Sequence, residues 1–251
     1  MNEERFTGRA DIYERYRSGY PEALMHYLYT EVGLRGDSAV ADIGAGTGIL
    51  TELLLRRGSR VFAVEPNGDM RSTAERKLSR YPGYVSVNAA AEATGLPDDS
   101  VDFVAVATAF HWFDKNQFRN ECRRILKDDG KAILIWNVKD MASELVRESA
   151  QISREFCPGV ESVSDGIHNL DNGEFARFFR DGQYDTRSFP NPQQLDEDGF
   201  VGRSLSSSYA PSEGADAYEP YVEALRALFK RYAEKGTLWL EQVTKSYVGV
   251  V

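Results

Sequence analysis

Short apolar runs alternate with stretches of helical periodicity from residue 38 onward. The stretches 49–57, 68–80 and 114–127 carry the helical pattern. The apolar runs around them are AVADI (39–43), RVFAV (60–64), YVSVN (84–88), DFVAVA (102–107) and KAILIW (131–136). This alternation is typical of a parallel sheet with helices on both faces, because each crossover packs a helix back on the sheet. The pattern therefore predicts a doubly wound α/β fold.

The chain before and after this core is more helical. Apolar positions three or four residues apart over 11–32 predict helical segments that are interrupted near Ser18–Pro21. Beyond the core the pattern predicts helices at 141–156, 171–181 and 215–234, a loop with a short strand at 186–210, and a last strand in TKSYVGVV. We expect the C-terminal tail to complete the edge of the sheet.

These segments assemble into one expected domain over residues 1–251. It consists of a helical cap (1–36), a core (37–137) and a region (138–251) that holds a helical insertion, the substrate side and closing strands. The insertion is placed at 138–185, above the sheet.

Composition and charge narrow the classes of partner. The 39 acidic residues exceed the 30 basic ones and give a net charge of −9, which disfavours binding to nucleic acids and to anionic membranes. No apolar run approaches the ~20 residues of a membrane-spanning helix, and the first residues lack the apolar region of a signal peptide. We therefore expect a cytoplasmic protein that acts on a small molecule. Cys122 and Cys157 have no His or Cys neighbours at the spacing of metal ligands, so neither a metal site nor a disulfide is expected. The oligomeric state stays open.

A glycine-rich segment follows the first predicted strand. It reads Asp42-Ile43-Gly44-Ala45-Gly46-Thr47-Gly48 and leads directly into a predicted helix. Such a turn lets the backbone approach a ligand closely, and the helix start offers free N–H groups with partial positive charge. Glu65 lies 21 residues beyond Gly44, at the end of the second strand, where a carboxylate can accept both hydroxyls of a ribose. The two features together predict a nucleoside cofactor.

The spacing of the glycines distinguishes two cofactor classes. A dinucleotide fingerprint G-x-G-x-x-G needs glycine where this chain has Ile49, and it does not call for an acid at the position of Asp42. The segment instead resembles the first motif of class I S-adenosylmethionine-dependent methyltransferases, in particular the type 11-like, small-molecule branch. The resemblance covers residues 38–137 well and implies a Rossmann-like, seven-stranded, mostly parallel sheet. It implies cofactor contacts from the residues Asp42, Gly44, Ala45, Gly46, Gly48 and Glu65.

Further positions match the family's cofactor-binding segments. The resemblance implies contacts from Pro66 and Met70 after the second strand, although Met70 also suits ordinary helix packing. Ala91 and Glu92 match the adenine side, whereas Ala90 stands where relatives commonly have Asp. Past the fourth strand, Thr108 and Phe110 are candidate cofactor contacts, and Phe110, His111 and Trp112 are expected to wall the transfer site. In the cap, the resemblance suggests Tyr16 and Arg17 near the amino-acid end of the cofactor.

Two residues are candidates for acid–base chemistry. His111 has an imidazole suited to general base catalysis, and Tyr209 lies in the variable half where the family builds its acceptor pocket. Each has a structural alternative: His111 as the hydrogen-bonded anchor of its loop, and Tyr209 as part of a capped loop.

The sequence thus predicts transfer of a methyl group from S-adenosylmethionine to a small-molecule acceptor. In-line transfer needs alignment, exclusion of water and removal of a proton where the nucleophile carries one, so no catalytic triad is required. Two alternatives stay open: a cofactor-binding regulatory protein that keeps the fold without the transfer, and an NAD(P)-dependent oxidoreductase.

Overall fold

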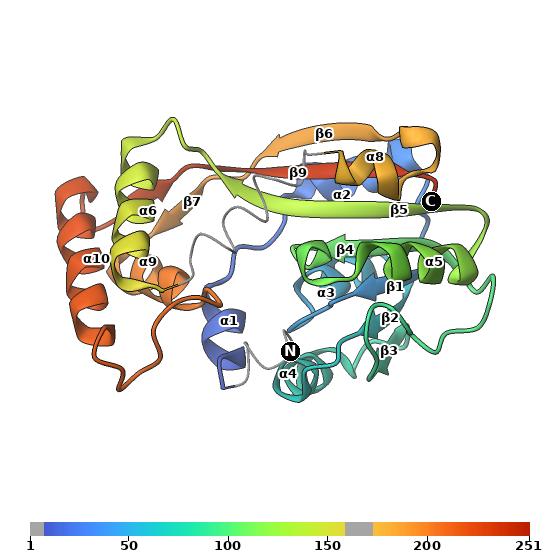
Figure 1. Cartoon of the computed structure of the whole chain (residues 1–251), viewed down its shortest axis with the longest axis horizontal. Helices are drawn as coiled ribbons and strands as arrows, with labels where there is room; N and C mark the ends of the chain where they lie inside the picture. The colour runs from blue at the N-terminus through green and yellow to red at the C-terminus, as the bar shows by residue number, and fades with distance from the viewer. Residues whose placement is uncertain (1–7, 159–172) are drawn as a thin grey trace.

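The computed structural model describes residues 8–158 and 173–251 and centres on a seven-stranded sheet (Figure 1). The strands are β1 (Ala39–Ile43), β2 (Arg60–Val64), β3 (Tyr84–Val87), β4 (Val101–Ala107), β5 (Leu126–Lys139), β6 (Asp185–Pro190) and β9 (Gln242–Gly249). They lie in the order β3-β2-β1-β4-β5-β9-β6. The pairs from β3 to β5 are parallel, and β9 is antiparallel to both β5 and β6. The predicted mostly parallel, seven-stranded sheet is confirmed.

The position of the C-terminal strand corrects one expectation. β9 does not complete the edge of the sheet but lies between β5 and β6, and β6 forms the edge. The reason is that residues 185–190, at the start of the segment expected to hold a loop with a short strand, form a strand that pairs along β9 from Asp185–Val248 to Pro190–Val243.

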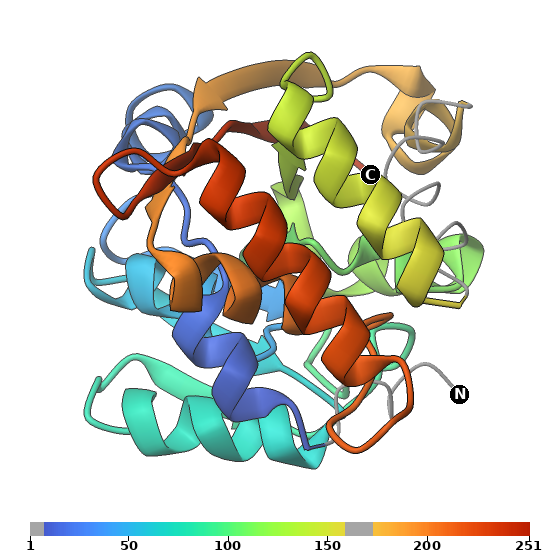
Figure 2. The ribbon, with the colours of Figure 1, turned by 90° about the vertical axis from the view of Figure 1, so that its left-hand side faces the viewer.

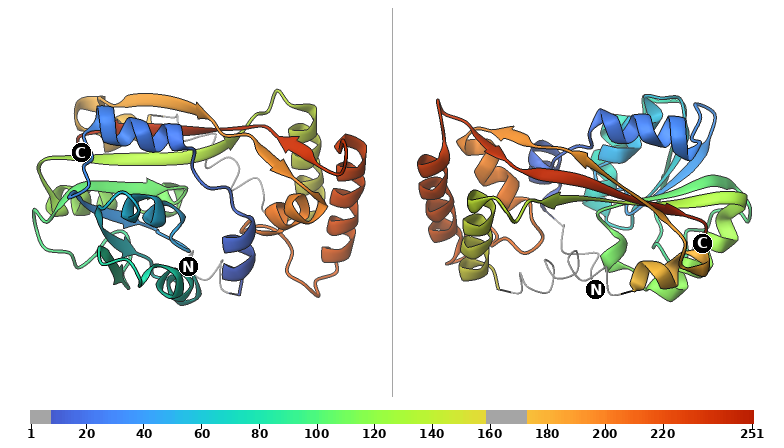
Figure 3. Two further views of the ribbon diagram at one scale, coloured as in Figure 1. Left: turned by 180° about the vertical axis from the view of Figure 1, so that it is seen from behind. Right: turned by 90° about the horizontal axis from the view of Figure 1, so that it is seen from above.

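Helices cover both faces of the sheet, as Figure 3 shows from two further sides. One face packs against α2 (Glu22–Tyr27), the π-helical turn η2 (Leu28–Val32), α3 (Ile49–Leu55) and α4 (Gly68–Leu78). The other face packs against α5 (Lys115–Ile125) and α8 (Glu174–Phe178). Two short 3₁₀ turns, η3 (Phe110–Trp112) and η5 (Arg180–Gly182), follow β4 and α8. This arrangement confirms the doubly wound fold.

A second group of elements stands beyond one end of the sheet and is called here the helical lobe (Figure 2). It comprises α6 (Glu144–Phe156), α9 (Glu197–Leu205), α10 (Tyr218–Tyr232) and the hairpin of β7 (Gln193–Leu195) and β8 (Leu238–Leu240). The lobe has its own apolar core, with Val146, Phe200, Tyr221 and Leu225 at its centre. The N-terminal helix α1 (Ala10–Tyr16) packs against α9 and so joins the cap to the lobe.

The helix α9 lies within 186–210, where a loop with a short strand was expected. Asp196 caps it by accepting the Gly199 N–H at 2.8 Å. Gly202 reads as a helix breaker in the sequence, but a Cβ there would lie 2.5 Å from the ring of Tyr16. The glycine thus provides the space in which α1 packs against α9, and that tertiary contact outweighs its poor helix propensity.

Other expectations fall partly outside the described ranges. The helix expected at 171–181 begins outside them, and the structure shows α8 at Glu174–Phe178. Cys122 and Cys157 are both buried and unpaired. Over residues 8–158 and 173–251, no helix is long and apolar enough to cross a membrane.

Candidate functional site

The turn after β1 has a backbone that favours glycine. Gly44, Gly46 and Gly48 have φ angles of 70°, 58° and 81°. A Cβ on Gly44 would lie 2.6 Å from the Cβ of Ala109, and one on Gly48 would lie 2.5 Å from Cδ1 of Leu78. Side chains at these two positions would therefore clash as well as strain the backbone. Because Gly44 and Gly48 have no side chains, the turn packs closely between Leu78 of α4 and the segment after β4.

Glu65 connects this turn to the end of β2. One carboxylate oxygen accepts the Gly46 N–H at 2.9 Å, and the other accepts the Asn67 N–H at 2.8 Å. Asn67 in turn caps α4, because its side-chain oxygen accepts the N–H groups of Asp69 and Met70. The carboxylate is thereby held at one edge of a cavity that it helps to line.

The cavity has a volume of about 240 Å³ and opens at the carboxyl ends of β1, β2 and β4. Ligands bind at this edge in open α/β sheets. It brings together eight of the predicted cofactor-binding residues: Gly44, Gly46, Glu65, Pro66, Met70, Ala91, Glu92 and Thr108. A carboxylate, apolar side chains and a bare glycine turn around one cavity fit a nucleoside that carries an amino acid.

Sequence reasoning did not assign several other lining residues to the cofactor. Tyr13, Asn67, Ala90, Trp112 and Phe113 also line the cavity. Asn67 could have been identified from the sequence. Asn just before a helical pattern is a frequent N-cap, and this Asn comes two residues after Glu65. Ala90 leaves space where a larger side chain was expected from the resemblance.

Asp42 lies beneath the turn and not on the cavity wall. It is 1% exposed, and its Oδ2 accepts the Thr51 hydroxyl at 2.6 Å. Burial raises the pKa of Asp42 to about 6, partly offset by the Thr51 hydrogen bond. The carboxylate thus ties β1 to α3 under the glycine turn, and a direct contact with the cofactor stays a prediction.

Phe110 occupies the core instead of the cavity wall. It is fully buried and packs edge-on against Trp136 and Phe178, at centroid distances of 6.2 and 4.9 Å. The structure thus corrects its expected place at the transfer site. Its neighbours Trp112 and Phe113 line the cavity, because the 3₁₀ turn after β4 points successive side chains to different sides.

Tyr16, Arg17, Ala45 and Gly48 also lie outside the cavity lining. Tyr16 packs against α9, and Gly48 packs against α4. Arg17 lies behind the cavity-lining Tyr13, with its guanidinium 4.8 Å from the centre of that ring.

Thr108 is a strained residue at the end of β4. Its φ of 59° places a β-branched residue in the left-handed region, which costs on the order of 1–3 kcal/mol. Its N–H still donates to the Ile135 carbonyl at 2.8 Å, so the sheet holds it in place. Strain of this kind concentrates at ligand sites, and Thr108 lines the cavity.

His111 stands beside the cavity without lining it. Its ring lies 4.4 Å from that of Trp112, and its Nδ1 is buried without a hydrogen-bond partner among the described residues. Burial lowers the pKa of His111 to about 4, helped by Lys115 and Arg17. The imidazole is therefore neutral at neutral pH.

We expect the ring protons of His111 to titrate with a midpoint of about 4, well below the ordinary value of 6.5. Because the unfolded chain binds this proton at a higher pH, stability falls as pH drops from about 6.5 towards 4. NMR titration measures the midpoint, and His111→Gln assigns the signal by removing it. A midpoint near 6.5 contradicts the burial of this side chain.

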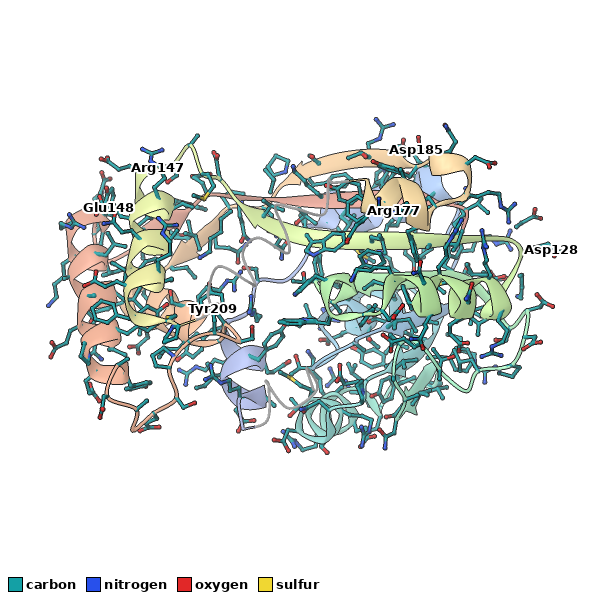
Figure 4. All side chains as sticks on the ribbon, viewed as in Figure 1. Asp128, Arg147, Glu148, Arg177, Asp185 and Tyr209 are labelled. Carbon is teal, nitrogen blue, oxygen red and sulfur yellow. The ribbon has the colours of Figure 1, made fainter. Side chains whose placement is uncertain are left out.

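Tyr209 lies on the side of the helical lobe that faces α1 (Figure 4). Burial alone would raise the pKa of Tyr209, but the charges of Lys139 and Arg17 and a hydrogen bond with Ser207 lower it below 10. Tyr209 therefore faces cations and does not line the cavity itself.

Known proteins resemble the part of the chain that builds this site. A family model for a methyltransferase domain matches residues 41–134. An uncharacterized methyltransferase of Mycobacterium tuberculosis is 37% identical over 147 residues, which cover 59% of this chain and 58% of that protein. An uncharacterized methyltransferase of Schizosaccharomyces pombe is 33% identical over 156 residues, which cover 61% of each. The matched stretch spans less than two thirds of either relative.

Solved structures resemble nearly the whole chain. A putative type II methyltransferase from Anaeromyxobacter dehalogenans superposes with a TM-score of 0.61 at 23% identity, covering 94% of this chain and 98% of that one. A putative methyltransferase from an antibiotic biosynthesis pathway of Anabaena variabilis also gives 0.61 at 23% identity, with 90% and 96% covered. At these identities the likeness is one of fold.

Proposed function

We propose that the protein transfers the methyl group of S-adenosylmethionine to a small molecule, since a family model for a methyltransferase domain matches residues 41–134 around the site. The observation that carries the proposal is the single cavity that joins the glycine turn to Glu65, with the Gly46 N–H 2.9 Å from the carboxylate. A nucleoside with an amino-acid tail needs these two features side by side. When bound, the cofactor supplies an activated methyl group on a sulfonium.

The residues of this chain have distinct roles in the proposal. Glu65 would accept the sugar hydroxyls, and Met70 and Ala91, which line the same cavity, would contact the base. The glycine turn leaves room for the amino-acid end. The matched relatives and the lining residues support this assignment. Asp42 has an indirect role, because its hydrogen bond with Thr51 stabilises the glycine turn.

The acceptor side is formed by aromatic residues. Trp112 and Phe113 line the cavity beside the strained Thr108, and they would exclude water from the reacting atoms. The chemistry then depends on alignment of nucleophile and methyl group. A cavity of about 240 Å³ and a net charge of −9 favour a small acceptor over a nucleic acid.

His111 and Tyr209 are proposed to handle the proton of the acceptor. His111 is neutral and has a free Nδ1 lone pair or N–H among the described residues, so it can orient a hydroxyl or amine. Tyr209 has a pKa lowered by neighbouring cations, which brings its proton transfer nearer to neutral pH.

Titration calorimetry tests the proposal with two ligands. We expect S-adenosylhomocysteine, the demethylated cofactor, to bind, and NAD to give no heat. Heat from NAD alone would refute the proposal in favour of the oxidoreductase. Turnover of labelled S-adenosylmethionine with a metabolite panel then separates an enzyme from a binding protein of the same fold.

A further inference from the structure

Three cationic side chains meet where the cap, the sheet and the helical lobe come together. Arg17 follows α1, Lys139 ends β5 and Arg203 belongs to α9; we call them the cation cluster. Arg203 is 7% exposed, and Arg17 and Lys139 are half-buried. The main electrostatic neighbours of Lys139 are Tyr209, Arg203 and Arg17. Three positive charges thus share one interior region.

The cluster has no anionic partner over the described residues. None of the three cations forms an ion pair there, although other partly buried cations such as Arg124 and Lys77 do. Arg203 donates its Nε to the Ser18 hydroxyl at 3.1 Å, and Arg17 donates to the Ser206 carbonyl at 3.2 Å. These neutral acceptors leave the positive charge uncompensated. Burial lowers the pKa of Arg203 to about 9, and the charge of Arg17 lowers it further in the same direction.

Hydrogen-bonding groups beside the cluster are also unsatisfied. The Arg17 Nε is buried and has no acceptor among the described residues. Gln242 is 2% exposed, and both polar atoms of its amide lack a partner there. Gln242 lies directly opposite Lys139 in the antiparallel pair of β5 and β9, so both side chains stand on the same face of the sheet. Buried polar groups are rarely left unpaired, which points to a ligand that completes them.

The cluster adjoins the cofactor cavity. The Arg17 guanidinium lies 4.8 Å from the ring centre of Tyr13, which lines that cavity. Arg17 also acts electrostatically on His111, the neighbour of Trp112 on the cavity wall. A molecule seated on the cluster would therefore reach the transfer site.

We propose that the cation cluster is the acceptor site, and that the acceptor carries a carboxylate or phosphate group held by Lys139, Arg203 and Arg17. The proposal rests on the proposed function and specifies the acceptor's charge. Arginine suits such groups because its planar fork binds two oxygens at once. Tyr209 adds a donor at the edge of the cluster.

Calorimetry on protein saturated with S-adenosylhomocysteine tests the charge of the acceptor. Succinate, citrate and inorganic phosphate serve as anionic probes, and succinamide is the neutral match for succinate. We expect at least one anion to bind and succinamide not to bind. If only the carboxylate probes bind, the site takes a carboxylate; if only phosphate binds, the site takes a phosphate.

Variants assign the binding to the cluster. Lys139→Met and Arg203→Met should each weaken anion binding at least tenfold and leave the affinity for S-adenosylhomocysteine nearly unchanged, whereas Lys139→Arg should retain anion binding. Lys230→Met, on the exposed side of α10, is the matched control and should change neither. Circular dichroism checks that each variant folds.

Three results would overturn the proposal. In the first, the anions give no heat while S-adenosylhomocysteine binds normally. In the second, the anions bind all variants equally. In the third, Lys139→Met and Arg203→Met lose binding of S-adenosylhomocysteine instead, which would mean that the cluster binds the carboxylate of the cofactor. In each case the proposed function survives, since its own tests are the binding of S-adenosylhomocysteine and methyl transfer by the unaltered protein.

Discussion

Glu65→Ala is expected to weaken the binding of S-adenosylhomocysteine at least tenfold. The carboxylate holds the Gly46 N–H at 2.9 Å and the Asn67 N–H at 2.8 Å, so it both shapes the cavity edge and presents acceptors to the sugar. Hydrogen bonds to a charged group contribute about 1.5–3 kcal/mol, and about 1.4 kcal/mol corresponds to tenfold in affinity. Titration calorimetry measures the change.

Two further variants sharpen this test. Glu65→Gln keeps the shape but turns one oxygen into an NH₂ group, which must face a backbone N–H or a sugar hydroxyl. We therefore expect a loss close to that of the alanine variant. Glu223→Ala, on an exposed position of α10, removes the same charge far from the cavity and should leave affinity unchanged. A folded Glu65→Ala protein with full affinity would contradict the role of this carboxylate.

The sheet was predictable because its strands are visible in the sequence as short apolar runs. β1 and β2 coincide with the apolar runs 39–43 and 60–64, since buried parallel strands need continuous apolar sequence. The lobe was harder to predict. In α9 the glycines at 199 and 202 hide the helix, and the reason for Gly202 is the Tyr16 ring from a segment 186 residues away in sequence (202 − 16). Contacts of this kind are invisible to local patterns.

The candidate site shows the same division. Gly44, Glu65 and Thr108 were found because each lies at or just beyond the carboxyl end of a strand, where ligands bind in this fold. Asp42 and Phe110 occur in the same motifs, but the direction of each side chain turns it into the interior. Sequence proximity places a residue near the site, and backbone geometry decides whether it faces the ligand.

The cation cluster could not be read from the sequence. Its members come from the residue after α1, the end of β5 and a helix that the local sequence pattern did not predict. Each looks alone like an ordinary surface arginine or lysine, and the overall charge of −9 gives no indication of a positive interior. Only the fold brings the three together.

Arg203→Met is expected to stabilise the ligand-free protein at pH 7 by about 1–4 kcal/mol, the range found when buried ion pairs are replaced by apolar side chains of similar volume. Arg203 is 7% exposed, carries a pKa lowered to about 9 by burial and by Arg17, and forms no ion pair among the described residues. Because its folded pKa is depressed, its charge costs stability throughout the range below pH 9. The cost diminishes as pH rises from about 9 towards 12.5, where the folded state releases the proton first.

Denaturant unfolding at pH 7 measures the effect, with Arg123→Met on the exposed side of α5 as the matched control. The methionine gives up the bond to the Ser18 hydroxyl, about 1 kcal/mol, and keeps most of the apolar volume. Citrate or phosphate, whichever binds, should stabilise the unaltered protein and not the variant, because a ligand adds stability only to the state that binds it. A folded variant less stable than the original would show that Arg203 is already compensated, and the need for an anion at this place would disappear with it.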